Sequence, residues 1–117
     1  MMIPEYWKKF VETNSLIGED FEFSEDEDLS EMGADFEIMN EQQCISEATE
    51  AYPGIVAVKL GYFPVAMCLE GSGDYYYIKT EEGPNGALYR IYHDAVEGEK
   101  LASDGIEKVI ESYASIL

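Results

Sequence analysis

Residues 65–92, with the sequence VAMCLEGSGDYYYIKTEEGPNGALYRIY, contain three strand-like runs separated by two turn signals. The runs are rich in aromatic and aliphatic residues that favour strands, and they cover residues 65–69, 74–79 and 87–92. Glycine and serine follow the first run, and Asn85-Gly86, a strong hairpin signal, precedes the third. Because both connections are short, we predict that the three strands pair as an antiparallel meander.

The segments on both sides of this meander extend the predicted fold. Immediately before it, residues 55–60, IVAVKL, predict a further strand. After it, Ser103 is a suitable helix N-cap, and the apolar residues that follow have helical spacing. We therefore predict a last helix over residues 104–116.

Two helices are predicted in the first half of the chain. Apolar residues at three- and four-residue steps around Trp7 predict a helix over residues 3–12 with its aromatic stripe in the core. Asn40, followed by Gln43, forms a capping box for a second helix over residues 41–51. The residues of this second helix that we expect to face inward are Cys44, Ile45, Ala48 and Tyr52.

The segment between these two helices is mainly a loop in our prediction. Residues 35–39 alternate as a short strand does, whereas residues 19–34 predict an acidic loop with brief strand structure at Phe21 and Phe23. All the elements together predict one α+β domain over residues 1–117. We expect a mostly antiparallel sheet of about four to six strands, with helices packed on one face.

The charge of the chain restricts its partners. The sequence contains 25 Asp and Glu residues against 7 Lys and Arg residues, which gives a formal net charge of -18. Such a surface repels phosphate backbones and anionic membranes, so we expect neither nucleic-acid nor membrane binding. It attracts basic proteins instead, and it accelerates their approach over long distances.

The acidic residues are concentrated in the first half of the chain. No Lys or Arg occurs between Lys9 and Lys59, and residues 19–28 contain seven acids in ten positions. Two interpretations stay open for this block, namely a solvated loop and a docking surface for a basic protein. The candidate partner-binding residues are Glu19, Asp20, Glu22, Glu25, Asp26, Glu27, Asp28, Glu31 and Asp35.

Residues with catalytic or metal-binding chemistry are few, and we predict no enzyme activity, cofactor or metal. The single histidine, His93, is expected to form a turn pair with Asp94, and nothing in the sequence activates the thiol of Cys68. Without a signal peptide, both cysteines are expected to be reduced in the cytoplasm. Residues 26–37 resemble a calcium-binding loop, but Glu31 occupies the position that requires glycine.

Four short motifs occur together in the second half of the chain. They are residues 61–66, GYFPVA; residues 71–78, GSGDYYYI; residues 88–94, LYRIYHD; and residues 101–103, LAS. This set resembles the SUKH superfamily, small domains found as bacterial immunity proteins and in fungal cell-wall-assembly regulators. The N-terminal helix and Pro53 also match the family pattern. The positions that we single out are Trp7, Pro53, Gly61, Gly73, Asp74, Tyr76, Arg90, His93 and Asp94.

The resemblance implies an α+β fold, no catalysis and a protein partner. Immunity proteins of this kind neutralise polymorphic toxins, often nucleases or deaminases, and a nuclease that grips phosphate is commonly basic. We therefore predict a cytoplasmic immunity protein, monomeric or weakly dimeric, whose acids occlude a basic toxin while Tyr75–Tyr77 brace the sheet and offer exposed rings. A regulatory scaffold domain without a toxin, or a small-ligand or metal-binding module, are the alternatives.

Overall fold

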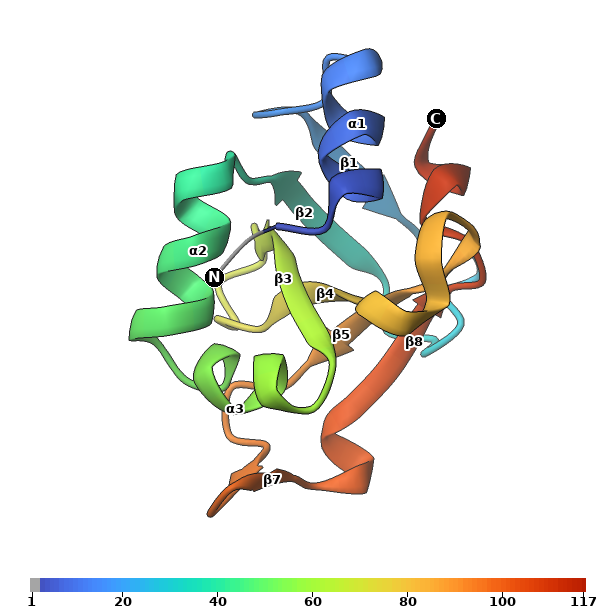
Figure 1. Ribbon diagram of the computed structural model, residues 1–117. Coiled ribbons are helices and arrows are strands. Elements are labelled where there is room, and N and C mark those ends of the chain that lie inside the picture. Colours follow the sequence, from blue (N-terminus) through green and yellow to red (C-terminus); the bar gives the residue numbers. More distant parts are fainter. Residues whose placement is uncertain (1–2) are drawn as a thin grey trace.

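The computed structural model describes residues 3–117 and contains a curled, six-stranded antiparallel sheet (Figure 1). Its strand order is β1-β2-β3-β4-β5-β8. The strands are β1 (Asp20–Phe23), β2 (Ala34–Ile38), β3 (Tyr62–Cys68), β4 (Tyr75–Lys79), β5 (Leu88–Ile91) and β8 (Ile106–Ile110). A separate hairpin consists of β6 (Val96–Glu97) and β7 (Lys100–Leu101). The predicted α+β class and antiparallel sheet are confirmed.

Within residues 3–117, six helical segments accompany the sheet. The α-helices are α1 (Glu5–Thr13), α2 (Glu41–Glu50) and α3 (Gly54–Lys59), and the 3-10 turns are η1 (Thr80–Asn85), η2 (Ser103–Gly105) and η3 (Tyr113–Ile116). The predicted capping box is present at the start of α2. Gln43 donates its backbone N–H to the Asn40 side chain at 2.8 Å, and the Gln43 side chain accepts from the Asn40 N–H at 2.9 Å.

The meander predicted from residues 65–92 is the centre of the sheet. Strand β4 pairs with β3 on one side and with β5 on the other, both antiparallel. In the second pairing Tyr76 lies opposite Arg90, and Tyr77 lies opposite Tyr89. Because neighbouring residues of a strand point to opposite faces, Tyr76 and Tyr77 belong to the two different faces of the sheet.

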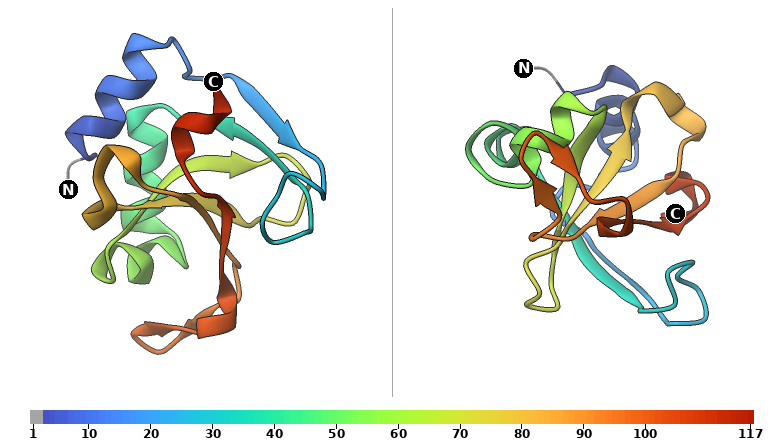
Figure 2. Two further views of the ribbon diagram at one scale, coloured as in Figure 1. Left: turned by 90° about the vertical axis from the view of Figure 1, so that its right-hand side faces the viewer. Right: turned by 90° about the horizontal axis from the view of Figure 1, so that it is seen from below.

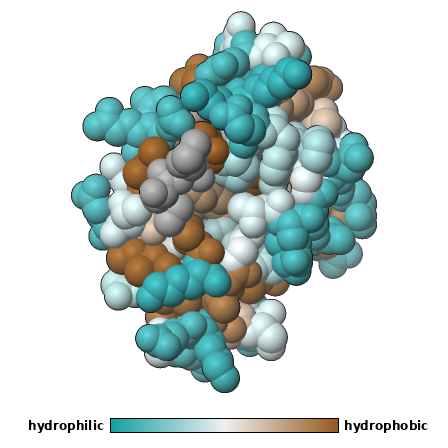
Figure 3. Space-filling model, viewed as in Figure 1, coloured by the Kyte–Doolittle hydropathy of each residue, from teal (hydrophilic) through white to brown (hydrophobic). Residues whose placement is uncertain are grey.

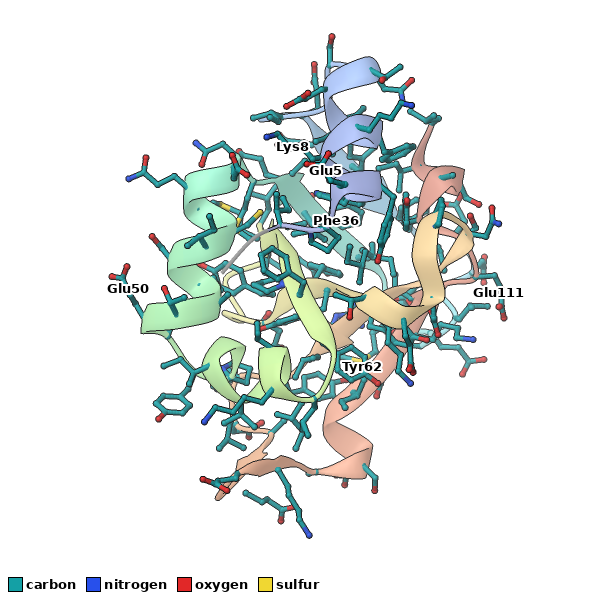
Figure 4. The ribbon with its side chains drawn as sticks, viewed as in Figure 1. Glu5, Lys8, Phe36, Glu50, Tyr62 and Glu111 are labelled. Atoms are coloured by element: carbon teal, nitrogen blue, oxygen red, sulfur yellow. The ribbon has the colours of Figure 1, made fainter. Side chains whose placement is uncertain are left out.

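Each face of the sheet carries an apolar cluster. The larger cluster includes Tyr76 and receives side chains from α1 and α2, among them Trp7, whose ring meets Tyr113 edge-on at 5.0 Å. Phe36 of β2 belongs to it and points into the space between α1, α2 and β3 (Figure 4). The smaller cluster surrounds Tyr77 and contains Ala57 of α3.

The strand predicted over residues 55–60 is wrong, because this segment forms α3. A short apolar run has no periodicity that separates a strand from a buried helix, so its surroundings decide. The carbonyl of Pro53 accepts hydrogen bonds from the N–H groups of Val56 and Ala57, which starts the helical turn. Gly54 lies so close to α2 that a Cβ there would collide with the carbonyl of Glu47.

The helix predicted over residues 104–116 is also wrong. A short 3-10 turn at Ser103–Gly105 leads into β8, which pairs with β5 from Ile91 opposite Ile106 to Leu88 opposite Ile110. The sequence IEKVI has a helical stripe and strand propensity at once. The edge of β5 that is not paired with β4 can form backbone hydrogen bonds with residues 106–110, and these bonds stabilise the strand over the helix.

Two tyrosine predictions are corrected by the structure. Tyr52, expected to face inward, is 63% exposed just beyond the end of α2. Tyr76 and Tyr77, expected to include exposed rings, are both fully buried because the sheet is covered on both faces at β4. Only Tyr75 of this run keeps partial exposure.

The visible surface is mostly polar. Figure 3 shows hydrophilic residues over α1, the outer side of α2 and the β6–β7 hairpin, and hydrophobic residues around α3. Within residues 3–117, every helix is too short or too polar to span a lipid bilayer. Met1 and Met2, which belong to the N-terminal stretch used for the signal-peptide prediction, lie outside the described residues.

Candidate functional site: an acidic hairpin

Residues 19–37, which we call the acidic hairpin, contain the predicted partner-binding residues. They form β1, a connecting loop over residues 24–33 and β2. Figure 2 shows the loop projecting from the end of the hairpin that lies away from α1 and α2. The hairpin contains ten Asp and Glu residues and no Lys or Arg.

Pairing of β1 with β2 places like charges opposite one another. Asp20 lies opposite Glu37, and Glu22 lies opposite Asp35. These four carboxylates point to one face of the hairpin, because Phe21 and its neighbours at alternate positions point to the other. Like charges directly across a ladder destabilise it, so the rest of the fold must hold the hairpin together.

A buried ion pair holds the loop of the hairpin against the sheet. The guanidinium of Arg90 in β5 lies 3.2 Å from the Asp28 carboxylate, and both side chains are almost completely buried. Arg90 also donates to the carbonyl of Gly33 at 2.6 Å and to the hydroxyl of Ser30 at 2.8 Å. Hydrogen bonds to Tyr76 and Asp28 raise the pKa of Arg90 despite its desolvation, so it remains a cation.

Hydrogen bonds within the loop complete this arrangement. Asp28 accepts from both the N–H and the hydroxyl of Ser30 at 2.7 Å. The N–H of Leu29 donates to the carbonyl of Val109 in β8 at 2.8 Å, so the loop bridges from β2 to the opposite edge of the sheet. Near the start of the loop, Ser24 donates two hydrogen bonds to the Glu27 carboxylate, one from its backbone N–H and one from its hydroxyl. The backbone bond and the hydroxyl bond both lower the pKa of Glu27.

Asp28 is therefore not part of the exposed acidic surface that the sequence predicted. Only 2% of its surface is accessible, and its charge is neutralised by Arg90. Asp35 is half-buried, and the other seven predicted partner-binding acids are exposed. These seven are Glu19, Asp20, Glu22, Glu25, Asp26, Glu27 and Glu31.

A groove of about 530 Å³ follows the hairpin where β1 enters the loop. We call it the acidic groove; its lining contains five acids and no base, together with the apolar side chains of Phe23 and Met32. The acids are Glu22, Glu25, Asp26, Asp35 and Glu70. A second hollow of about 510 Å³ shares Glu25 and Asp26 with it and continues to Glu31.

Three features of this surface were missed from the sequence. Glu70 comes from the β3–β4 turn, and only the pairing of β2 with β3 brings it to the hairpin. Leu29 and Met32 are 51% and 52% exposed, although they lie in the loop that Arg90 anchors. Their apolar character was visible in the sequence, but their exposure follows from Asp28 taking the inward position.

The few cations of the chain leave the acidic groove unneutralised. Within residues 3–117, the lysines that form salt bridges do so elsewhere, as Lys8 with Glu41, Lys79 with Glu81 and Lys108 with Glu111. Arg90 forms its salt bridge with the buried Asp28. The five carboxylates of the groove consequently lack an ion-pair partner in the described part of the chain, and their field extends into the solvent.

Asp74 and His93, two of the motif residues, meet near the groove. The buried Asp74 carboxylate accepts from the His93 backbone N–H and contacts its ring Nδ1, both at 2.8 Å. The hydrogen bond and the negative charge of Asp74 raise the pKa of His93. His93 and Asp94 form the predicted turn, which the N–H of Ala95 closes by donating to the Tyr92 carbonyl at 3.0 Å. The ring contact with Asp74 joins the β3–β4 turn to the end of β5.

The other motif residues have structural positions. Trp7 lies in the core, and Pro53 is buried before α3. Gly61 and Gly73 take left-handed backbone conformations with φ of 94° and 79°, which glycine adopts without strain. Asp94 is exposed in the turn after β5.

The groups that could support other chemistry are dispersed or engaged. Within residues 3–117, no cluster of three or more His, Cys, Asp or Glu side chains is arranged to hold a metal ion. The Cys68 sulfur contacts the Ser72 hydroxyl at 3.1 Å, and His93 contacts Asp74 instead. Burial raises the pKa of the Cys44 thiol to about 12, so that side chain is an unreactive part of the core.

Comparison of the chain with models of protein families, with characterised proteins and with solved structures gave no match. The resemblance to the SUKH superfamily therefore stays a prediction from the quoted motifs.

Proposed function

We propose that the protein is a non-enzymatic binding protein that receives a basic protein segment in the acidic groove. The observation that carries this proposal is the convergence of five carboxylates from β1, the loop, β2 and the β3–β4 turn around one groove. Within residues 3–117 none of the five forms a salt bridge, because Arg90, the cation next to the groove, is paired with Asp28. Maintaining such crowded like charges destabilises the fold. A cationic partner removes that repulsion when it binds, so association is favoured over the free state.

The groove also contains apolar side chains suited to a protein contact. Interfaces combine a small apolar centre with a polar rim, and methionine adapts its shape to a partner. Met32 lies among the groove carboxylates, and Leu29 lies beside them in the second hollow. Charge would bring the partner in quickly, and these side chains would slow its release.

On the resemblance to SUKH immunity proteins, the partner that we propose is a toxin. A toxin that acts on nucleic acid needs a cationic surface to hold phosphate groups, and a row of carboxylates on a rigid scaffold can occupy the same surface. The protein would then act in the cytoplasm as an immunity protein, by occlusion and without chemistry. Genes for such pairs are adjacent, so the neighbouring open reading frame supplies the toxin to test.

The proposal is tested by co-expressing the chain with the product of that neighbouring reading frame. The variant E25Q/D26N/E70Q removes three groove charges, and E97Q/E99Q/D104N removes three exposed charges from the opposite end of the chain. We expect the groove variant to lose complex formation and protection from toxicity, whereas the control variant keeps both. Equal affinity and equal salt dependence for all three proteins would reject the groove as the binding site.

A further inference from the structure

Strand β1 forms a free edge of the sheet. It is the terminal strand in the order β1-β2-β3-β4-β5-β8, and Figure 2 shows it at the outer margin of the molecule. The opposite edge, β8, differs because the N–H of Leu29 already donates to the carbonyl of Val109 there. An uncovered edge is a template for an additional strand, since its outward N–H and C=O groups lack partners.

The register of the hairpin shows which backbone groups are free. Ile38 of β2 donates its N–H to the carbonyl of Glu19 at 3.0 Å, which fixes the phase of the ladder. Hydrogen-bonded and non-hydrogen-bonded pairs alternate in an antiparallel ladder. Phe21 and Phe23 lie two and four residues after Glu19, so both direct their backbone N–H and C=O groups toward β2, as Glu19 does. Asp20 and Glu22 direct theirs outward, and within residues 3–117 these groups have no hydrogen-bond partner.

The two faces of this edge have opposite chemical character. The side chains of Asp20 and Glu22 are exposed on one face, next to Glu37 and Asp35 of β2. On the other face, Phe21 and Phe23 are half-buried and lie beside Phe36 with ring centroids 6.0 and 6.1 Å apart. The edge thus exposes carboxylates on one face and part of the apolar core on the other.

We infer that β1 pairs in an antiparallel arrangement with an extended segment of the partner that carries Lys or Arg at alternate positions and apolar residues between them. This inference rests on the proposed function and specifies how the partner docks. A residue that pairs with Asp20 or Glu22 across the edge exchanges backbone hydrogen bonds with it and has its side chain on the same face. Charge complementarity therefore selects Lys or Arg there, and the apolar residues between them cover Phe21 and Phe23.

Charge also decides against a second copy of this chain as the occupant. Two copies joined through β1 would place Asp20 and Glu22 of one beside the same residues of the other, and each chain carries a net charge of -18. The edge continues into the acidic groove, because Glu22 belongs to both. A cationic strand on β1 is thereby directed toward Glu25 and Asp26.

The pairing geometry defines a peptide experiment with a matched control. The probe is the acetylated and amidated peptide KVKVKVK, and two derivatives carry backbone N-methyl groups, one on its interior lysines and the other on its valines. In the inferred antiparallel pairing the lysine N–H groups face β1 and the valine N–H groups face solvent. Lysine methylation should weaken binding about tenfold, because it removes two backbone hydrogen bonds to β1, and valine methylation should change binding less than about twofold.

Two protein variants test the same bonds from the other side. Glu22→Pro removes an outward N–H that makes no bond to β2, and proline is tolerated at such edge positions. Glu22→Gln removes only the charge. We expect Glu22→Pro to weaken peptide binding more than Glu22→Gln does, and we expect the amides of Asp20 and Glu22 to exchange with solvent more slowly in the wild-type complex.

The outcomes separate this inference from the proposed function. If both methylated peptides bind equally, or if the Asp20 and Glu22 amides remain unprotected in the complex, strand pairing at β1 is wrong. The proposed function would still stand if the groove variant E25Q/D26N/E70Q loses the toxin. If that variant binds the toxin normally while lysine methylation still weakens peptide binding about tenfold, the edge is the docking site and the groove is not.

Discussion

Asp28 differs from the other acids of the hairpin because it carries the contact that fixes the loop. Removing one member of a buried ion pair leaves the other charge desolvated without compensation. We predict that Asp28→Asn lowers the free energy of unfolding by about 3 kcal/mol and exposes the amides of Leu29 and Ser30 to hydrogen exchange. Urea denaturation and exchange measured by NMR test both effects.

Asp26→Asn is the matched control for this prediction. It makes the same chemical change in the same loop, but Asp26 is exposed. We expect it to change stability by less than about 0.5 kcal/mol, as exposed substitutions usually do. Equal stabilities of the two variants would show that the Arg90–Asp28 pair does not anchor the loop.

His93 provides a pH-dependent prediction at the same scale. Asp74 raises the pKa of His93 in the folded protein. A raised pKa means that the ion pair stabilises the fold fully below the unfolded pKa of about 6.5 and that this contribution is lost as the pH rises through the folded value. The stability difference between wild type and His93→Ala should therefore shrink from about pH 5.5 to about pH 8.

The single histidine makes this prediction directly measurable. An NMR titration of its ring protons should give a pKa above the ordinary value in the wild type and a lower one in Asp74→Asn. An unchanged titration in Asp74→Asn would mean that the 2.8 Å contact between Asp74 and the ring does not persist in solution.

The motif resemblance singled out part of this site. Arg90, His93 and Asp74 stood out in motifs, and the structure brings each of them to a specific partner. Which acid would pair with Arg90 was not predictable, because residues 19–37 offer ten carboxylates of equivalent local sequence. The choice depends on the reach of the loop from β2 to β5, a long-range property that no short pattern contains.

At the scale of elements, the junction of α2 and α3 depends on one glycine. A Cβ on Gly54 would overlap the backbone carbonyl of Glu47, which cannot move aside as a flexible side chain could. We predict that Gly54→Ala destabilises the protein by about 3 kcal/mol, at the upper end of the usual cost of overpacking. Chemical denaturation gives the magnitude, and faster amide exchange in α3 would locate the effect.

Gly71→Ala provides a comparison for this substitution. Gly71 has a left-handed φ of 80°, but no atom lies within 4 Å of a Cβ placed there. Only the backbone penalty of about 1–2 kcal/mol applies to it. A cost for Gly54→Ala no larger than that for Gly71→Ala would contradict the close approach of α3 to α2.

The two wrongly predicted elements, α3 and β8, share a cause. Both are short segments, of six and five residues, whose local sequence suits a helix and a strand alike. The first is decided by the close packing of Gly54 on α2, and the second by pairing with β5. By contrast, α2 and the pairing of the central strands were predicted correctly, because a capping box and strand propensity are local properties. The connection that contains Asn85-Gly86 includes the 3-10 segment η1 and is longer than a tight hairpin turn.

At the scale of the whole molecule, the net charge of -18 predicts that salt stabilises the fold. Screening weakens repulsion between exposed carboxylates over distances beyond about 8–10 Å at physiological ionic strength, whereas the buried Arg90–Asp28 pair is screened much less. We predict that raising NaCl from about 0.05 M to about 0.5 M increases the free energy of unfolding by about 1 kcal/mol. Urea denaturation at both salt concentrations measures the change.

The position of the repulsion can be tested with the charge variants. If the strain is concentrated at the acidic groove, E25Q/D26N/E70Q should be more stable than the wild type at low salt and should respond less to NaCl. The control E97Q/E99Q/D104N, with an identical change of net charge, should respond more nearly as the wild type does. Identical behaviour of the two variants would mean that the charge acts as a diffuse field and that the groove holds no concentrated repulsion for a cationic partner to relieve.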